Sequence, residues 1–220
     1  WHYVRLVTLG LWRSVRLQAR GATRLEHPFL TTRALTRDGV TTALSVDMWH
    51  EAPSPAALAL ECRLTPKNFQ GPSLGWTRRI TVRPGMNRLG FEGHAPGARL
   101  WWPNGLGFPA VYQFTCQVRD ARGRLLDRYV TNWGARTVRA ASTPRGKRSN
   151  EYSWQLVVNN RPVFVKGTNW CYPDALLRLD RVRQQRFIVL AKHAHIQLIR
   201  IWGGGPAEND ALYDLCDEQG

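Results

Sequence analysis

The most constraining stretch of the chain is residues 196–205, where a short apolar run rich in β-branched residues ends in three consecutive glycines. Such a run predicts a buried parallel strand, and Pro206 directly after it suits the first turn of a helix. Arg200 and Trp202 stand near the carboxyl end of this strand, where core residues are expected. In α/β barrels that end carries the loops that build the active site. The pattern therefore marks Arg200 and Trp202 as candidate ligand-binding residues.

The segments around this strand predict two helices. Asp180 can cap a helix whose apolar side chains follow helical spacing, namely Phe187, Leu190, Ala191 and Ala194. Beyond the strand, acidic residues precede a second apolar stripe, formed by Leu212, Leu215 and Cys216. Acidic residues are common in the first turn of a helix, so Glu208 and Asp210 are interpreted as solvated acids of this second helix. Glu218, near its end, is interpreted in the same way.

A hairpin and a further strand are predicted ahead of the first helix. Residues 154–158 and 162–165 form apolar arms around Asn159 and Asn160, and asparagine tolerates the positive φ of a tight turn. The second arm runs on to Asn169 and Trp170. The order strand, helix, strand, helix over residues 151–220 predicts the first two units of a parallel α/β fold.

The longer part of the chain, residues 23–140, has a different pattern. Short apolar runs recur at residues 44–48, 59–64, 79–82 and 112–118, and turn signals separate them at residues 38–39, 84–85, 104–105 and 122–123. This spacing predicts an antiparallel β-sandwich. Residues 4–7 and 11–17 also alternate as strands do, but they are too few to close a domain. Residues 141–150 are polar without an apolar period and predict a linker.

The charge of the chain is strongly basic, and its distribution limits what it implies. The net charge is +15, and all of it lies in residues 1–150, which hold 23 Lys and Arg against 8 Asp and Glu; residues 151–220 hold 8 of each. Arginine supplies 27 of the 31 basic residues, and these are dispersed along the chain. Nucleic-acid binding normally shows a basic stripe or a known motif, so this composition does not favour it, and it favours an acidic polysaccharide little more.

The cysteines and the apolar runs exclude several classes of site. The four cysteines, Cys62, Cys116, Cys171 and Cys216, show neither a Cys-x-x-Cys motif nor a histidine at zinc spacing, so no metal or redox site is expected. Cys62 and Cys116 could pair within one sandwich, although burial as small apolar residues is favoured. No apolar run is long enough to cross a membrane. The chain opens without Met, so we expect a longer parent protein, and its compartment stays open, with the cytoplasm favoured over secretion or the periplasm.

Residues 100–105, Leu-Trp-Trp-Pro-Asn-Gly, interrupt the strand pattern and allow two interpretations. A rigid loop whose aromatic side chains cover the edge of the sandwich is favoured, because large aromatic area often fixes a loop between domains. A platform that stacks on sugars is the alternative. The three glycines at 203–205 could also cradle a phosphate, but no Lys-Ser/Thr follows them.

Several of these segments, taken in order, resemble glycoside hydrolase family 2 in its β-mannosidase-like branch. They are residues 10–13 (Gly-Leu-Trp-Arg), 100–105, 133–136 (Trp-Gly-Ala-Arg), 158–170, 200–205 (Arg-Ile-Trp-Gly-Gly-Gly) and 213–218 (Tyr-Asp-Leu-Cys-Asp-Glu). The resemblance covers nearly the whole chain. No single segment is specific, but the ordered set is.

The resemblance implies a multidomain β plus α/β parent enzyme with a jelly-roll sugar-binding domain, an immunoglobulin-like β-sandwich and a TIM barrel. Residues 1–22 would be the last strands of the jelly roll, 23–140 the sandwich, 141–150 the linker, and 151–220 the first two βα units of the catalytic (β/α)8 barrel. A carbohydrate substrate, a terminal β-mannoside, would bind at the strand tips, through Asn169, Trp170, Asp174, Arg200 and Trp202. Asp174 is equally suited to capping its own loop. Neither a cofactor nor a metal is implied.

The family's chemistry implies further residues beyond this chain. A retaining mechanism uses two carboxyl groups about 5–5.5 Å apart, one as acid/base and one as nucleophile. The resemblance places both glutamates on later barrel strands, after Gly220, and places Arg200 beside the nucleophile, which it would hold ionised. Asn160 replaces the usual glycine of the hairpin turn, and residues 171–179 look closer to relatives that act on mannosyl-linked glycans. Endo-β-mannosidase, exo-β-glucosaminidase and a non-catalytic glycan- or protein-binding sandwich therefore remain alternatives.

Overall fold

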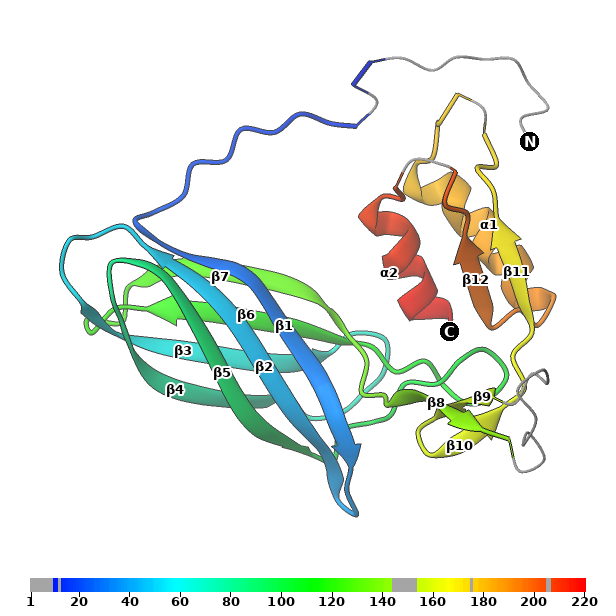
Figure 1. The fold of residues 1–220 in the computed structure, drawn as a ribbon, viewed down its shortest axis with the longest axis horizontal. Coiled ribbons are helices and arrows are strands. Elements are labelled where there is room, and N and C mark those ends of the chain that lie inside the picture. Colours follow the sequence, from blue (N-terminus) through cyan, green and yellow to red (C-terminus); the bar gives the residue numbers. More distant parts are fainter. Residues whose placement is uncertain (1–9, 12, 144–153, 175, 205–206) are drawn as a thin grey trace.

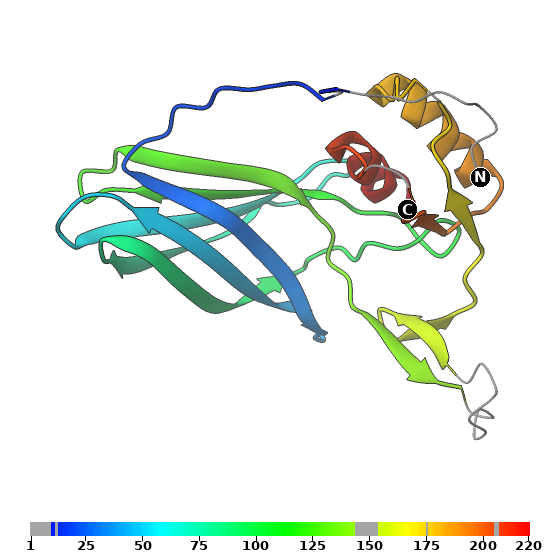
Figure 2. The same ribbon diagram turned by 45° about the horizontal axis from the view of Figure 1, so that its top comes forward.

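The computed structural model describes residues 10–11, 13–143, 154–174, 176–204 and 207–220. An elongated β-sandwich fills one side of Figure 1, and a small three-stranded sheet and a βα pair lie on the other side. Turning the molecule in Figure 2 shows that helix α2 (Asp210–Gln219) lies between the end of the sandwich and the rest of the βα pair.

The sandwich consists of two antiparallel sheets. One has the order β1-β2-β5, and the other has the order β4-β3-β6-β7. The strand bounds are β1 (Thr23–Leu35), β2 (Gly39–His50), β3 (Ala56–Pro66), β4 (Leu74–Val82), β5 (Gly85–Pro96), β6 (Tyr112–Arg119) and β7 (Leu125–Trp133). Each predicted run of residues 23–140 falls inside one of these strands, so the predicted sandwich is confirmed.

Alternation along the central strands builds the sandwich core. Every second residue of β6 points inward, and Tyr112, Phe114, Cys116 and Val118 are at most 2% exposed. Cys62 lies directly opposite Cys116 in the β3–β6 register, and both thiols are free, with 3.7 Å between the sulfur atoms. The contact with the Cys116 thiol, together with burial, raises the pKa of Cys62 far above its ordinary value. These thiols therefore act as small apolar residues, the role that the sequence favoured.

The segment before β1 differs from its prediction. Residues 4–7 lie outside the described residues, and residues 13–21 form no strand, with Val15 79% and Leu17 102% exposed. A strand requires a hydrogen-bonded neighbour, and no described strand pairs with this segment. It runs as an extended trace from the βα pair to β1 (blue in Figure 1). Of the strand predicted at residues 11–17, the described residues 11 and 13–17 therefore form none.

A small sheet of order β10-β9-β8 connects the two sides of the molecule. It contains β8 (Val138–Ser142), β9 (Trp154–Val158) and β10 (Arg161–Val163). The predicted hairpin is confirmed, because Asn159 and Asn160 join β9 to β10 with φ of 49° and 63°, both positive as a type I′ turn requires. Of the predicted linker, residues 141 and 142 belong to β8, whereas residues 144–150 lie outside the described part.

The two turn asparagines should respond differently to substitution by glycine. Asn159 is buried, and its side chain accepts a hydrogen bond from Thr137 N at 3.0 Å and donates one to Trp101 O at 2.9 Å. Asn160 is exposed. We expect Asn160→Gly to raise the free energy of unfolding by about 0.5–1 kcal/mol, because glycine adopts positive φ without strain. The matched change Asn159→Gly should lower it by about 1–3 kcal/mol. Urea unfolding measures both, and equal effects would contradict the assignment.

The βα pair has the predicted order. Strand β11 (Gly167–Trp170) is parallel to β12 (Leu198–Ile201), α1 (Arg181–His193) connects them, and α2 follows. Asp180 caps α1 as predicted, accepting from Arg183 N. The second helix is capped by Asn209, which accepts from Leu212 N. The sandwich followed by a parallel βαβα unit is thus the observed architecture, in agreement with the expected β plus α/β fold class.

Two details of this unit correct the sequence analysis. Strand β12 is not buried: Leu198 and Arg200 are exposed, and only Ile199 and Ile201 pack toward the helices, because the β11-β12 sheet is covered on one face. The buried face of α1 is Gln184 and Ile188, whereas Leu190 is 64% exposed. Phe187 packs against the small core as predicted. The contact with α2 turns the buried face toward Gln184 and Ile188 and away from Leu190.

Gln184 places a polar side chain in this core, which lowers the free energy of unfolding. Its side chain is fully buried, and within the described part of the chain neither its amide nitrogen nor its amide oxygen has a hydrogen-bond partner. Replacing such a group by an apolar one of similar shape removes a desolvation penalty of about 1–3 kcal/mol. We therefore expect Gln184→Met to stabilise the βα pair by about that amount in thermal unfolding. The matched control Gln185→Met, at an exposed position of the same helix, should change stability by less than about 0.5 kcal/mol. A destabilised Gln184→Met variant would show that the amide has a partner.

Candidate functional site

The predicted site residues come from the carboxyl ends of β11 and β12. The parallel register sets Asn169 opposite Arg200 and Trp170 opposite Ile201. Side chains alternate along a strand, so Asn169 and Arg200 share one face of this sheet, while Trp170 and Ile201 face the helices. Arg200 Nη1 donates to Asn169 Oδ1 at 3.2 Å, and both side chains are exposed. The structure thus brings together two of the predicted residues on the open face of the sheet.

Trp202 continues this edge one residue beyond β12. Its backbone N donates to Trp170 O at 3.2 Å, so the ladder between the strands extends to it. Its half-buried indole ring lies so close to Gly204 that a Cβ there would stand 2.3 Å from the ring. A side chain at 204 would therefore force the Trp202 ring to move, which is a packing reason for glycine that needs no phosphate.

Trp170 has a different position from Asn169. It is 8% exposed, packs in the small core with Ile188, Leu212 and Leu215, and makes an edge-on contact with Phe187 at 6.0 Å between ring centroids. Its indole Nε1 donates to Glu208 Oε1 at 2.7 Å. The indole is therefore an anchor of the strand tip and lies away from the face that carries Asn169 and Arg200.

Asp174 is buried in the loop after β11. Its Oδ1 accepts from Leu176 N at 2.8 Å, and its Oδ2 accepts from Arg178 Nε at 3.1 Å and pairs with Arg183. Two guanidinium groups and a backbone amide thus engage both carboxylate oxygens. These contacts favour the loop-capping role that the sequence left open for Asp174.

Glu208 is buried, contrary to its prediction as a solvated helix acid. It is 5% exposed and lies just before Asn209, the N-cap of α2. Burial raises the pKa of its carboxyl group, while the hydrogen bond from Trp170 and the charge of Arg13 oppose the rise. The sequence gives one indirect signal: a buried indole N–H such as that of Trp170 needs an acceptor.

Glu208 and Glu218 do not form a pair of catalytic carboxyl groups. Glu218 lies at the other end of α2, where it pairs with Lys67 at 2.8 Å and with Arg181 at 2.7 Å. At 1.5 Å per residue the two backbones are roughly 15 Å apart along α2. Retaining glycosidases need about 5–5.5 Å between carboxyl groups and inverting ones about 6.5–9.5 Å. Glu218 therefore connects the sandwich to the helices through these two ion pairs.

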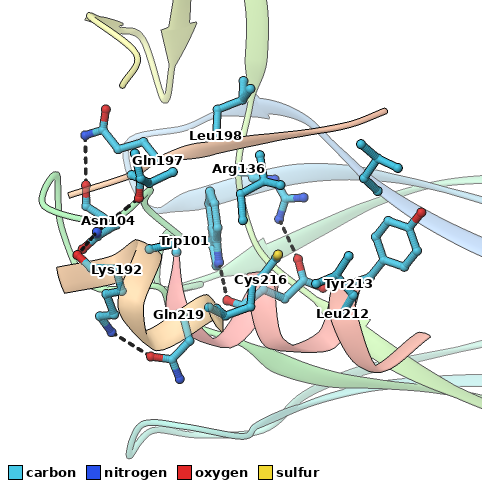
Figure 3. A pocket seen from close by; sticks show the side chains of 17 residues that line it. Trp101, Asn104, Arg136, Lys192, Gln197, Leu198, Leu212, Tyr213, Cys216 and Gln219 are labelled. Carbon is cyan, nitrogen blue, oxygen red and sulfur yellow. Dashed lines mark hydrogen bonds and ion pairs between the residues drawn. The ribbon is translucent and has the colours of Figure 1, made fainter. Parts of the chain in front are cut away.

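A hollow lies on the helix side of β12, away from the face that carries Asn169 and Arg200. It has a volume of about 340 Å³ and is enclosed by α1, α2, β12 and the loop of residues 100–105 (Figure 3). Its polar groups pair with one another: Gln197 Nε2 with Asn104 O at 2.9 Å, Lys192 Nζ with Gln219 Oε1 at 3.0 Å, and Arg136 with Asp217 at 3.8 Å. A pocket whose polar groups are already satisfied offers little to a sugar. We interpret it as a packing gap between the sandwich and the helices.

The loop of residues 100–105 holds this junction together. Trp101 Nε1 donates to Asp217 O at 2.7 Å, and the Arg136 guanidinium lies 4.5 Å from the Trp101 ring. Asn104 Nδ2 donates to Lys192 O at 2.8 Å and to Ile196 O at 3.2 Å, at the end of α1 and before β12. Trp102 packs against Gly107 and the Arg161 guanidinium. Both rings are thus engaged, which favours the rigid-loop interpretation over a sugar platform.

Within the described residues, no group of three or more His, Cys, Asp or Glu side chains is placed to hold a metal ion. In the same part of the chain, no helix has the length and apolar character that a membrane crossing requires.

Comparisons with known proteins agree with this architecture. No family model matches the chain. Over 98% of its length the chain is 29% identical to β-mannosidase B of Neosartorya fischeri and, equally, to that of Aspergillus terreus. It spans about a quarter of the length of these relatives, since the match covers 24% of each.

Solved structures give the same result. The β-D-mannosidase of Dictyoglomus thermophilum superimposes with a TM-score of 0.83 at 29% identity, over 95% of this chain and 25% of that one. An exo-chitosanase from Amycolatopsis orientalis superimposes with a TM-score of 0.71 at 18% identity, over 91% of this chain and 22% of that one, which shows the shared fold alone. The predicted resemblance to the β-mannosidase-like branch of glycoside hydrolase family 2 is confirmed.

Proposed function

We propose that this chain is part of a retaining glycoside hydrolase that cleaves β-mannosidic linkages, and that it contributes one side of the sugar pocket. One observation carries the proposal: Asn169 and Arg200 lie side by side at the carboxyl ends of two parallel strands. That is the edge at which barrel enzymes bind their substrates. The similarity to β-mannosidases over nearly the whole chain supplies the class of substrate.

The roles proposed for the strand-tip residues follow from their chemistry. Arg200 offers a permanent charge and several N–H donors, which suit a neighbouring carboxylate and would keep a nucleophile ionised. Asn169, already the acceptor of one Arg200 hydrogen bond, can orient that guanidinium and donate to a sugar hydroxyl. Trp202 offers an aromatic surface on which the apolar face of a sugar can stack.

The two carboxyl groups of the reaction are proposed to lie in a part of the protein that follows Gly220. Among the described carboxylates of the βα pair, Asp174 pairs with two arginines, Glu208 accepts from Trp170, and Glu218 pairs with Lys67 and Arg181. None of them stands beside Arg200. On this proposal the acid/base and the nucleophile join Arg200 only in the complete barrel.

Two alternatives are kept. The first is a β-glucosaminide substrate, because the shared fold also occurs in the exo-chitosanase of Amycolatopsis orientalis, an exo-β-D-glucosaminidase. The second is a non-catalytic module that binds glycans or proteins. Within the described residues β12 pairs with β11 alone, and an unpaired strand edge can recruit another chain.

The test compares substrates on the complete protein that contains this chain. Nitrophenyl β-mannoside, β-glucosaminide, β-glucoside and β-glucuronide are offered at equal concentration, and kcat/KM is measured for each. The proposal expects the β-mannoside to exceed the others at least about 100-fold, because discrimination by hydrogen bonds to a sugar hydroxyl reaches that size. A preference for the β-glucosaminide supports the first alternative, and a folded protein inactive on all four supports the second.

A further inference from the structure

Glu208 is a buried acid that the proposed reaction leaves without a role. Glu208 is 5% exposed, and Trp170 Nε1 donates to its carboxylate at 2.7 Å. Burying a carboxyl group is unfavourable unless hydrogen bonds or charges compensate. We therefore infer that the hydrogen bond between Glu208 and Trp170 has a function of its own.

The partner of Glu208 connects both strand tips. Trp170 is the last residue of β11 and directly follows Asn169. The Trp170 carbonyl accepts from Trp202 N at 3.2 Å, so the same residue also holds the start of the loop after β12. The orientation of Trp170 thus bears on both Asn169 and Trp202. The carboxylate fixes that orientation, because it holds the polar atom of the indole while Phe187 contacts the ring.

The residues just before α2 are held from two further directions. Tyr172 OH donates to Ala207 O at 3.3 Å. Arg13 donates to the carbonyl oxygens of Ala207 and Glu208, the latter at 2.7 Å. These hydrogen bonds fix the backbone of Glu208, and the fixed backbone points its carboxylate toward Trp170. This is the arrangement by which a second layer of residues orients those that bind substrate.

We propose that Glu208 is a positioning residue, which orients Trp170 and through it sets the places of Asn169 and Trp202 in the sugar pocket. The inference rests on the proposed function and deepens it. It adds a residue that touches no substrate, and it assigns the contact between the segment before α2 and the tip of β11 to the geometry of the pocket.

Kinetics of the complete protein give the first test. Displacement of about 1 Å at a reacting site can reduce the rate about 100-fold, so Glu208→Ala should lower kcat for nitrophenyl β-mannoside about 10- to 100-fold. Glu208→Gln keeps an acceptor for the indole and should stay within about fivefold of the unsubstituted protein. Trp170→Phe removes the donor, and the double variant Trp170→Phe/Glu208→Ala should be no slower than the slower single variant.

A spectroscopic test on the 220-residue chain does not depend on activity. The chain has ten tryptophans, and loss of one indole ¹⁵N–¹H signal in Trp170→Phe assigns that of Trp170. The groups that face Glu208 are the Trp170 indole, the Arg13 guanidinium and the Tyr172 hydroxyl, whose own pKa is raised to about 12 by burial and by the charge of Glu208. Burial raises the pKa of Glu208 above its ordinary value, so the Trp170 signal should shift at a higher pH than a solvent-exposed glutamate would cause. Glu208→Gln should abolish the shift.

The outcomes separate this inference from the proposed function. Absence of glycosidase activity in the folded complete protein would overturn the proposed function, and the positioning role with it, even where the indole signal shows that the contact exists. An active enzyme whose Glu208→Ala variant keeps kcat and KM, or loses thermal stability alone, would overturn only the positioning role. A Trp170 signal without pH dependence in the unsubstituted chain would also overturn it.

Discussion

Replacing Trp101 with alanine should separate the unfolding of the sandwich from that of the βα pair. The Trp101 indole donates to Asp217 O at 2.7 Å, stacks with Arg136 at 4.5 Å and packs against Gly134. Truncating a buried tryptophan destabilises by about 3–5 kcal/mol, and Trp101 is half-buried, so we expect a loss of about 2–4 kcal/mol at the junction. Urea unfolding followed by circular dichroism should then show two transitions.

The matched control is Trp154→Ala, the same change at a residue of β9 that is 60% exposed. It should leave the unfolding curve nearly unchanged. If Trp101→Ala unfolds in a single transition with an unshifted midpoint, the loop of residues 100–105 does not hold the junction. The sugar-platform interpretation of its aromatic side chains would then regain support.

Loss of Arg200 should have the largest effect on activity. In the complete protein, Arg200→Ala should lower kcat/KM for nitrophenyl β-mannoside about 10²–10³-fold, the range typical of removing one aligned hydrogen-bond donor from a developing charge. Arg200→Lys keeps a point charge but loses the planar arrangement of donors that reaches Asn169 Oδ1 at 3.2 Å, so it should recover only part of the activity.

Arg139→Ala, at an exposed position of β8, is the control for Arg200 and should stay within about twofold of the unsubstituted protein. A similar loss in both variants would indicate a general effect of charge on the enzyme. Full activity of Arg200→Ala would remove the strand tips of β11 and β12 from the proposed pocket.

Local patterns predicted much of this fold. The β-branched run before three glycines predicted β12, Asp180 predicted the start of α1, and the two asparagines predicted the turn of the β9–β10 hairpin. The cap and turn signals are each confined to a few consecutive residues, whose backbone preferences decide the outcome. Strand β12 also depends on its hydrogen-bonded neighbour β11. The alternation in residues 23–140 likewise predicted the sandwich, because one face of each sheet must be buried.

The sequence could not predict features that depend on distant partners. The acceptor for the Trp101 indole is 116 residues away, and that for the Trp170 indole is 38 residues away. The burial of Glu208 follows from the second contact, so a charge in front of a helix was interpreted as solvated. The exposure of Leu190 on α1 has a similar cause. Phe187 packs against the small core as predicted, but only the packing against α2 shows that Gln184 and Ile188, rather than Leu190, complete the buried face.

The most direct test of the central claim is the position of the catalytic nucleophile. A mannosyl fluoride whose 2-hydroxyl is replaced by fluorine should leave a stable glycosyl ester on the nucleophile of a retaining enzyme, and peptide mass mapping of the complete protein then identifies the labelled carboxylate. We predict one labelled glutamate in a peptide that follows Gly220, and no labelling of the 220-residue chain alone. A sugar attached to Asp174, Glu208 or Glu218 would contradict it.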